Sequence, residues 1–368
     1  MKILRSGAKY SAIVGIGERI RKISQETGEE FLLLNRGVNS VCSIDLNSVV
    51  QEIDFNTNIM QVYPPSKGRL ELRNAINDSY FQGEANVDHL SISGGGMSAL
   101  DLVFQTLDVE RIYLPEYYWG SYYQIMTVRR KEAGVYSCFK ELEKQPEKLK
   151  GSAVVICDPN NPIGNKRDDQ ELLNVIRILN DHGVIVIVDS PYRRVFYSDE
   201  DRFYSELCSL DNVVVVESFS KSIGLSGQRL GFVYCNNSEF NEELGIRLMY
   251  ATNGINAFSQ VLVTQLLTSP RGKKAVGEFK KETVEGIRKN IVYLKERGLL
   301  ANEFYSDSEP MGIFVIVNQS EEDLLKKRIG SVSLSYFTRE NKERAQKYSR
   351  ICVSVPHDKF KQYFSQFE

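Results

Sequence analysis

The sequence is poor in the residues that build metal sites and disulfide frameworks. Its 368 residues include only three histidines and six cysteines. The cysteines are scattered singly, with no Cys-x-x-Cys pair and no histidine-rich partner segment. Cys157, Cys235 and Cys352 lie in apolar, strand-like runs, so we expect buried free thiols rather than disulfides or metal ligands. The pattern predicts a protein without a metal site.

Long hydrophobic runs and a marked charge imbalance are also lacking. No apolar run approaches the roughly 20 residues needed to cross a bilayer, and the first ten residues lack the apolar core of a signal peptide. The formal net charge of −2 gives no reason to expect nucleic acid or an anionic membrane as a partner. We therefore expect a cytoplasmic protein of ordinary globular composition, with no internal repeat or low-complexity linker.

The middle of the chain alternates short apolar segments with helical patterns, notably Ser98–Leu107 and Asp168–His182. Strands that alternate with helices form a parallel sheet covered on both faces, so we expect an α/β fold with a mostly parallel central sheet. Ligands of such sheets bind at the carboxyl ends of the strands. The expected strands are Arg111–Pro115, Gly134–Phe139, Ser152–Cys157, Gly183–Asp189, Val213–Ser218 and Leu230–Cys235.

After Cys235 the pattern changes. Glu239–Leu267 and Gly272–Arg297 are each typical of a long helix, and the shorter segments that follow indicate a small α+β lobe. The N-terminal segment has its own helix, Ile16–Thr27, and an apolar run that we expect to pack with this lobe. We predict a large domain at residues 40–270 and a small domain formed by residues 1–39 and 271–368.

The most informative segment is Glu217–Gly231, which directly follows the β-branched run Val213–Val216. It places a lysine, Lys221, beside Ser218 and Ser220, with Arg229 eight residues further on. A lysine at the end of a buried strand suits Schiff-base formation with a carbonyl cofactor. The serines and the arginine suit the phosphate of such a cofactor. A loop rich in serine and glycine, with one solvated lysine, is the plain alternative.

Two glycine- and proline-containing turns lie upstream. Ser93–Leu100 contains three consecutive glycines and opens a helix, where free backbone amides bind phosphate. Its spacing does not match a dinucleotide fingerprint or a Walker loop. Asp158–Gly164, with the sequence Asp-Pro-Asn-Asn-Pro-Ile-Gly, follows a strand and is a turn whatever its function.

Two charged side chains at strand ends complete the set. Asp189 closes a buried apolar strand, where a carboxylate is costly unless it meets a cation or hydrogen-bond donors. Tyr192 follows three residues later. Arg350 begins a short apolar strand near the C-terminus, and its planar fork suits a carboxylate better than a lysine would. The alternatives are that Asp189 caps a helix and that Arg350 is a surface arginine.

In order and spacing, from about residue 30 to residue 355, these segments resemble the class I/II aminotransferases, which depend on pyridoxal 5'-phosphate (PLP). The lysine segment is most similar to histidinol-phosphate aminotransferases and threonine-phosphate decarboxylases. The resemblance implies aminotransferase fold type I, with a three-layer large domain and a small α+β domain built from both chain ends. Three departures from the family pattern stand out. Asp158 replaces an asparagine and Ile163 replaces a threonine. Ser190-Pro191 replaces the Glu-Ala of the usual Asp-Glu-Ala-Tyr segment.

The resemblance also implies roles for individual residues. Lys221 would hold PLP as an internal aldimine and move the substrate's α-proton, Asp189 would keep the ring nitrogen protonated, and Tyr192 would donate to the ring oxygen. The other expected cofactor contacts are Gly96 and Met97, Ser218, Ser220 and Arg229 for the phosphate, Asn161 for the ring oxygen, and Trp119 or Tyr117 for stacking. Of the two aromatic residues, we favour Trp119.

For the substrate, the resemblance implies that Arg350 grips the α-carboxylate and that the backbone at Gly37 approaches closely. Arg36 lies where it could contact an acidic or phosphorylated side chain of the substrate. Alternatively, it is a solvated surface residue. Tyr63 resembles a tyrosine that reaches the PLP phosphate of a neighbouring subunit, which implies a homodimer with shared active sites.

The expected reaction is the transfer of an amino group between an L-amino acid and a 2-oxo acid. A decarboxylase, lyase or synthase on the same scaffold is the main alternative, because the same residues serve PLP in each. A non-catalytic PLP-binding regulator is a further alternative, disfavoured because we see no appended DNA-binding module. Neither the amino donor nor the acceptor follows from the sequence.

Overall fold

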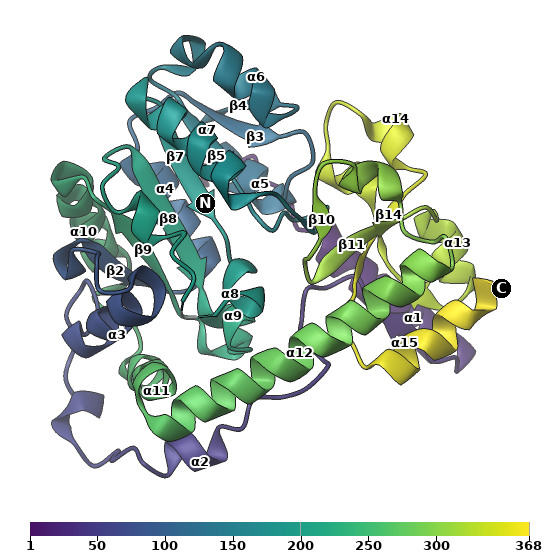
Figure 1. The fold of residues 1–368 in the computed structure, drawn as a ribbon, viewed down its shortest axis with the longest axis horizontal. Coiled ribbons are helices and arrows are strands. Elements are labelled where there is room, and N and C mark those ends of the chain that lie inside the picture. The colour runs from purple at the N-terminus through teal and green to yellow at the C-terminus, as the bar shows by residue number, and fades with distance from the viewer. Residues whose placement is uncertain (199, 368) are drawn as a thin grey trace.

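The computed structural model describes residues 1–198 and 200–367. Its large part is built on a seven-stranded sheet with the strand order β2-β9-β8-β7-β5-β3-β4 (Figure 1). In that order the strands are Leu90–Ser93, Gly231–Cys235, Val213–Ser218, Ile185–Asp189, Ala153–Ile156, Arg111–Pro115 and Glu132–Tyr136.

The sheet is mostly parallel, as the sequence predicts. Only β9 runs against its neighbours, β8 and β2. The central strands are short runs of valine and isoleucine that are almost fully buried. Such continuous apolar strands need cover on both faces, which helices provide (Figure 1). Because Asp189 of β7 pairs with Val216 of β8, the ends of these two strands meet at the same edge of the sheet.

The helices around this sheet largely follow the predicted ranges, with one exception. The segment Glu239–Leu267, predicted as a single long helix, forms two helices instead. Asn253 and Gly254 break it with positive φ values of 50° and 106°, which a helix cannot contain. The Asn256 side chain then caps the second helix by accepting a hydrogen bond from the Ser259 amide at 3.0 Å.

The α-helices of this part are α2 (Asn47–Val50), α3 (Leu70–Phe81), α4 (Gly96–Thr106), α5 (Gly120–Arg129), α6 (Phe139–Lys144), α7 (Asp169–Asp181), α8 (Arg193–Phe196), α9 (Phe219–Ser222), α10 (Ser238–Thr252) and α11 (Ala257–Thr268). Short 3₁₀ turns lie at Asn58–Met60, Val87–His89, Pro146–Leu149, Ser205–Leu207, Ser226–Gln228, Asn302–Tyr305, Leu334–Phe337 and Ser365–Phe367.

The C-terminal lobe contains the antiparallel sheet β11-β14-β13, and the N-terminal segment joins this lobe. Leu32 pairs with Ile329 in a short parallel ladder, as expected from the apolar N-terminal run. The elements of the lobe are β11 (Phe314–Val317), β12 (Ile329–Gly330), β13 (Val332–Ser333), β14 (Ser349–Cys352), α13 (Glu321–Lys326), α14 (Lys342–Ala345) and α15 (His357–Phe364), together with α1 (Ala12–Thr27) and β1 (Leu32–Leu33).

The large part and the lobe are joined by the segment between β1 and α2, by a long helix and by a short strand ladder. The long helix α12 (Pro270–Glu296) runs from α11 to α15 (Figure 1). A two-stranded ladder pairs β6 (Asn165–Lys166), which follows the Asp-Pro-Asn-Asn-Pro turn, with β10 (Glu309–Pro310). The two parts therefore contact each other beside that turn. The exact domain limits at residues 40 and 270 remain predictions.

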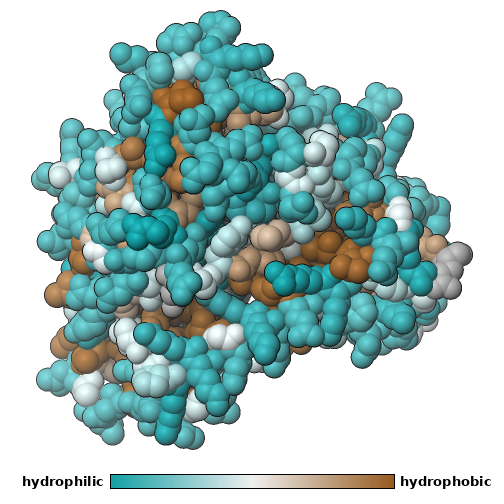
Figure 2. All heavy atoms as spheres, viewed as in Figure 1, coloured by the Kyte–Doolittle hydropathy of each residue, from teal (hydrophilic) through white to brown (hydrophobic). Residues whose placement is uncertain are grey.

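The surface seen in Figure 2 is mostly hydrophilic, with apolar atoms gathered in the hollow beside α12. A groove of about 1130 Å³ lies there, between α8 and α12. In the described part of the chain, none of the predicted site residues lines this groove. No helix of the described residues is long and apolar enough to span a bilayer. Cys157, Cys235 and Cys352 are buried free thiols, as predicted.

Candidate active site

Lys221 lies in the single turn of α9, directly after β8. Ser218 caps this turn by accepting a hydrogen bond from the Ser220 amide at 3.2 Å. The Lys221 side chain is half-buried, and its Nζ donates to the carbonyl oxygen of Gly37. Burial lowers the pKa of Lys221, and the charges of Arg229 and Arg350 act in the same direction. The amine therefore loses its proton more readily than an exposed lysine does.

The N-terminal loop reaches Lys221 because residue 37 has no side chain. A Cβ at Gly37 would lie 2.4 Å from Cζ of Phe314, so the Phe314 ring excludes any larger residue there. Phe314 in turn lies 3.9 Å from the guanidinium of Arg350. Gly37, Lys221 and Arg350, which are far apart in sequence, thus converge through one aromatic ring.

Arg350 is buried without a carboxylate beside it. Its guanidinium lies between the rings of Phe314 and Phe337, at 3.9 and 4.6 Å. It donates to Asn161 Oδ1 at 3.0 Å and to the carbonyl oxygen of Asn35 at 2.6 Å. Its Nε has no hydrogen-bond partner among the described residues. Burial lowers the pKa of Arg350 to about 10, so an anion bound here would relieve an uncompensated charge.

Asp189 presents the complementary case, a buried carboxylate without a cation. Only 4% of the residue is exposed, and its Oδ2 accepts a hydrogen bond from the Tyr122 hydroxyl. Burial raises the pKa of Asp189 to about 7, although the Tyr122 hydrogen bond opposes this shift. A protonated pyridine nitrogen is a cation that would suit this carboxylate.

Asn161 and Tyr192 are held together. Asn161 Nδ2 donates to the Tyr192 hydroxyl oxygen at 3.1 Å, while Asn161 Oδ1 accepts from Arg350. Both residues are buried, and burial raises the pKa of the Tyr192 hydroxyl. This links the two predicted ring contacts directly to the predicted carboxylate-binding arginine.

The predicted phosphate contacts gather at the N-terminus of α4. A Cβ at Gly95 would lie 2.8 Å from Arg229 Nη2, and a Cβ at Gly96 would lie 3.4 Å from Ser218 Cβ. Ser218 and Ser220 also share a hydrogen bond of 2.9 Å between their hydroxyls. Met97 occupies the first turn of α4, with 43% of the residue exposed. Helix amides, hydroxyls and a guanidinium together form a donor set suited to a phosphate.

The two candidate stacking residues have different surroundings. Trp119 packs edge-on against Tyr122, with ring centroids 5.5 Å apart, and Tyr122 holds Asp189. Tyr117 packs instead against Phe304 of the C-terminal part, at 5.6 Å. These contacts favour Trp119 over Tyr117. Tyr63, by contrast, is 83% exposed and stands apart from the other predicted site residues.

Sequence reasoning missed several side chains that build the site. Tyr122 is one of them, since nothing in the spacing indicates that its hydroxyl meets Asp189. Phe314 and Phe337 enclose Arg350, but each is an ordinary apolar residue in the sequence. Their distance in the chain from Arg350 leaves no local signal.

Glu217 is a further buried carboxyl that sequence reasoning did not assign. It is completely buried, accepts hydrogen bonds from the Tyr204 hydroxyl and the Ser218 amide, both at 2.8 Å, and precedes the predicted phosphate contacts. Burial raises the pKa of Glu217 from 4.5 to about 8. It is therefore expected to be largely protonated in the folded protein at neutral pH.

This raised pKa predicts a pH dependence of stability. An acid with a raised pKa binds more protons in the folded than in the unfolded state, so its contribution is fully present below pH 4.5. That contribution is lost as the pH rises toward 8. We expect the free energy of unfolding of the wild type, measured in urea, to fall with pH relative to a Glu217→Gln variant. The exposed Glu278→Gln variant should follow the wild type, and parallel curves for Glu217→Gln would contradict the assignment.

Comparison with known proteins finds a matching family. A family model described as "Aminotransferase class I and II" matches residues 30–365. The chain is 27% identical over 237 residues to a probable aspartate/prephenate aminotransferase of Aquifex aeolicus, covering 59% of each protein. It is also 27% identical over 268 residues to an aspartate aminotransferase of Pyrococcus horikoshii, covering 69% of this chain and 67% of that protein.

The fold has a close structural counterpart. The structure of aspartate aminotransferase from Thermus thermophilus with maleate matches with a TM-score of 0.82 and 18% sequence identity. The match covers 100% of this chain and 99% of that chain. Fold type I, expected from the motifs, is therefore confirmed.

Proposed function

Because this chain belongs to the class I and II aminotransferases, a family that uses PLP, we propose that it transfers an amino group between an amino acid and a 2-oxo acid. The observation that carries the proposal is a group of three side chains that lack an opposite charge among the described residues. They are a lysine with a lowered pKa, a buried carboxylate and a buried arginine. The charge of Arg350 reaches Lys221, and the charges of Arg350 and Asp189 both reach Tyr192.

Bound PLP would withdraw electrons from the α-carbon of an amino acid and so make its α-proton acidic. The protein must then accept and return that proton. The amine of Lys221, with its lowered pKa, is suited to both steps as a general base and acid. Asp189 would face the ring nitrogen and hold a proton there, with Tyr122 fixing the carboxylate.

The remaining residues would bind and orient. Arg350 would take the substrate's α-carboxylate in a two-pronged ion pair, aided by its unpartnered Nε. Asn161 and Tyr192 would contact the ring oxygen. Gly96, Met97, Ser218, Ser220 and Arg229 would hold the phosphate, and Trp119 would cover the ring face.

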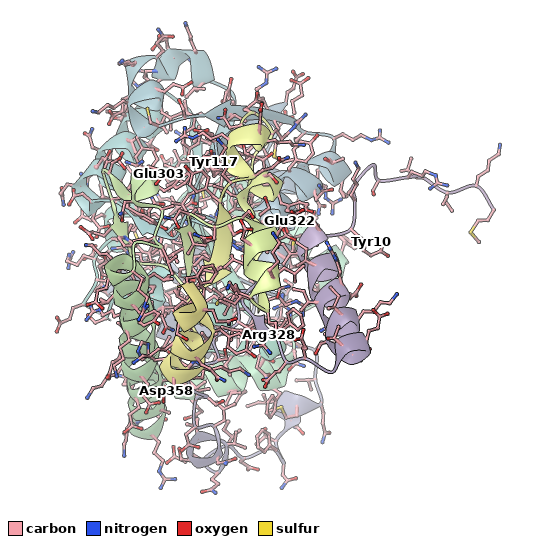
Figure 3. All side chains as sticks on the ribbon, turned by 90° about the vertical axis from the view of Figure 1, so that its right-hand side faces the viewer. Tyr10, Tyr117, Glu303, Glu322, Arg328 and Asp358 are labelled. Atoms are coloured by element: carbon pink, nitrogen blue, oxygen red, sulfur yellow. The ribbon has the colours of Figure 1, made fainter. Side chains whose placement is uncertain are left out.

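We also propose a homodimer that shares its active sites. Tyr63 is 83% exposed, and Val62 and Tyr250 are exposed as well. Gly254, four residues after Tyr250, packs against Pro64, so this side offers apolar surface to a second copy. The N-terminal segment before Tyr10 extends away from the body (Figure 3), and Met1, Leu4 and Tyr10 are exposed. In a dimer, Tyr63 would reach the phosphate bound by the partner subunit.

A single preparation tests both proposals. The PLP-loaded protein is mixed with one amino acid at a time, and its absorbance and the released oxo acid are measured. Conversion to the pyridoxamine form supports transamination, whereas release of carbon dioxide would identify a decarboxylase instead. Light scattering on the same sample should give the mass of two chains, and a monomer would contradict the shared site.

A further inference from the structure

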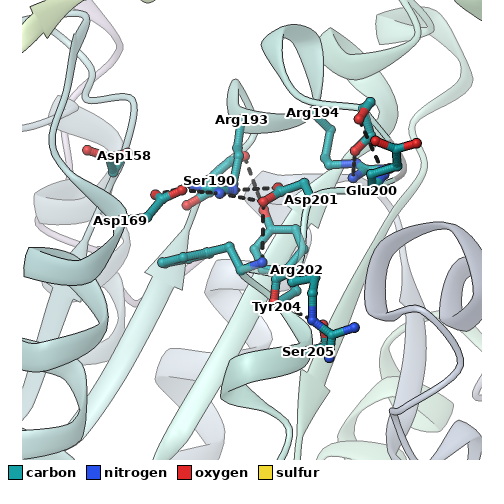
Figure 4. Close-up of polar contacts among 12 residues, drawn as sticks. Asp158, Asp169, Ser190, Arg193, Arg194, Glu200, Asp201, Arg202, Tyr204 and Ser205 are labelled. Carbon is teal, nitrogen blue, oxygen red and sulfur yellow. Dashed lines mark hydrogen bonds and ion pairs between the residues drawn. The ribbon is translucent and has the colours of Figure 1, made fainter.

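A network of buried charged side chains adjoins Asn161 and Tyr192. Arg193, which directly follows Tyr192 and is fully buried, lies between Asp169 and Asp201 (Figure 4). It donates two hydrogen bonds of 2.8 Å to Asp169 and bonds of 2.7 and 2.6 Å to Asp201. Such bidentate pairs fix the guanidinium in one orientation.

This network of charged side chains extends to the Asp-Pro-Asn-Asn-Pro turn. Lys166, only 5% exposed, lies 2.7 Å from Asp169 and 3.0 Å from Asp158. Asp158 is also 5% exposed, and its second oxygen accepts from the Arg167 amide at 2.9 Å. Burial raises the pKa of Asp158, and Lys166 opposes that shift. Each buried carboxylate therefore depends on a neighbouring cation.

These contacts close a ring. Asp158 lies three residues before Asn161, Asn161 bonds Tyr192 at 3.1 Å, and Tyr192 adjoins Arg193. Arg193 bonds Asp169, Asp169 pairs with Lys166, and Lys166 pairs with Asp158, which closes the ring. Lys166 also belongs to β6, which pairs with β10 of the C-terminal part. The ring thus stands where a strand of the large part pairs with a strand of the C-terminal part.

We infer that this ring of charges positions Asn161 and Tyr192, and that Lys166 is the partner required by Asp158. The departure at residue 158, a carboxylate where the resembled family has a neutral asparagine, is matched by a buried lysine eight residues on. Lys166 and Arg193 are positioning residues, since they act through the turn and through Tyr192. The inference rests on the proposed roles of Asn161 and Tyr192 toward PLP.

The test compares the equilibrium Kd for PLP of the wild type with those of Lys166→Met, Asp158→Asn and the double variant. Lys166→Met leaves the Asp158 charge buried without its cation, and we expect Kd to rise about tenfold, as when the outer support of a site is removed. The double variant restores a neutral turn and should return Kd to within about twofold of the wild type, because the two changes are coupled.

A matched control and a second variant keep the test decisive. Arg177→Met removes a half-exposed ion pair with Glu206 from α7, the helix that also carries Asp169, and should leave Kd unchanged. If Lys166→Met does not fold, Asp169→Asn breaks the same ring at its more exposed member and should raise Kd likewise.

The outcomes separate this inference from the proposed function. An unchanged Kd in the folded Lys166→Met or Asp169→Asn variant, or a double variant no better than Lys166→Met, would overturn the positioning role while the proposed function stood. A wild-type chain that does not bind PLP would overturn both.

Discussion

Replacing Lys221 with alanine is expected to abolish the visible absorbance of the PLP-loaded protein and to lower turnover by about 10⁴-fold or more. The side chain would supply both the covalent attachment and the proton transfer. No other amine is seen to take its place within the described residues, since Lys221 alone among the lysines contacts the Gly37 loop. Absorbance spectra and turnover with the best amino donor measure the two effects.

The control for this prediction is Lys281→Ala, which removes an exposed lysine from α12 and should keep both properties. A persistent yellow cofactor band in the Lys221→Ala protein would refute the assignment. The variant should fold like the wild type, because it removes one hydrogen bond and no salt bridge. Circular dichroism would establish this before the comparison is made.

Replacing Asp189 with asparagine is expected to lower turnover by about 10³-fold, with the PLP content changing less. The amide has nearly the same shape, but it carries no charge to hold a proton on the ring nitrogen. Because Asp189 is buried and has no cation within hydrogen-bonding reach among the described residues, its charge has no substitute nearby. The rate of the half-reaction at saturating amino acid measures this loss.

A milder companion variant separates charge from position. Tyr122→Phe keeps the carboxylate but removes its donor, which costs about tenfold in the same rate. Without that hydrogen bond the pKa of Asp189 should rise further, so activity should fall more steeply toward acidic pH. Wild-type rates in Asp189→Asn would remove Asp189 from the mechanism.

Local pattern predicted much of the large sheet. The valine run of β8, the apolar run of β7 and the amphipathic α7 each signal their structure through residues that are neighbours in the chain. The break between α10 and α11 was missed because the helical period continues across it. Asn253 and Gly254 adopt left-handed backbone there, which the pattern of apolar residues around them does not indicate.

The residues proposed to bind PLP were found by their order and spacing, but their surroundings were not. Asp189 ends an apolar strand and Lys221 lies in the short turn directly after another, and both features can be read locally. The Tyr122 hydroxyl on Asp189, the two rings around Arg350 and the Asn35 carbonyl come from segments up to 315 residues apart. Contacts of this kind depend on packing between segments that are distant in the chain, within the large part for Tyr122 and Asp189 and within the lobe for Arg350.

By itself, the amino-acid order determined most strands of the large sheet, most helices and the family, because hydrophobic periodicity and turn chemistry act between near neighbours. Tertiary structure alone decided which buried charges are compensated. Asp158 acquires Lys166 and Arg193 acquires two aspartates, whereas the hydrogen-bond partners of Asp189 and Arg350 among the described residues are neutral. Charge compensation depends on distances through a dry interior, and folding brings those groups together from distant parts of the chain.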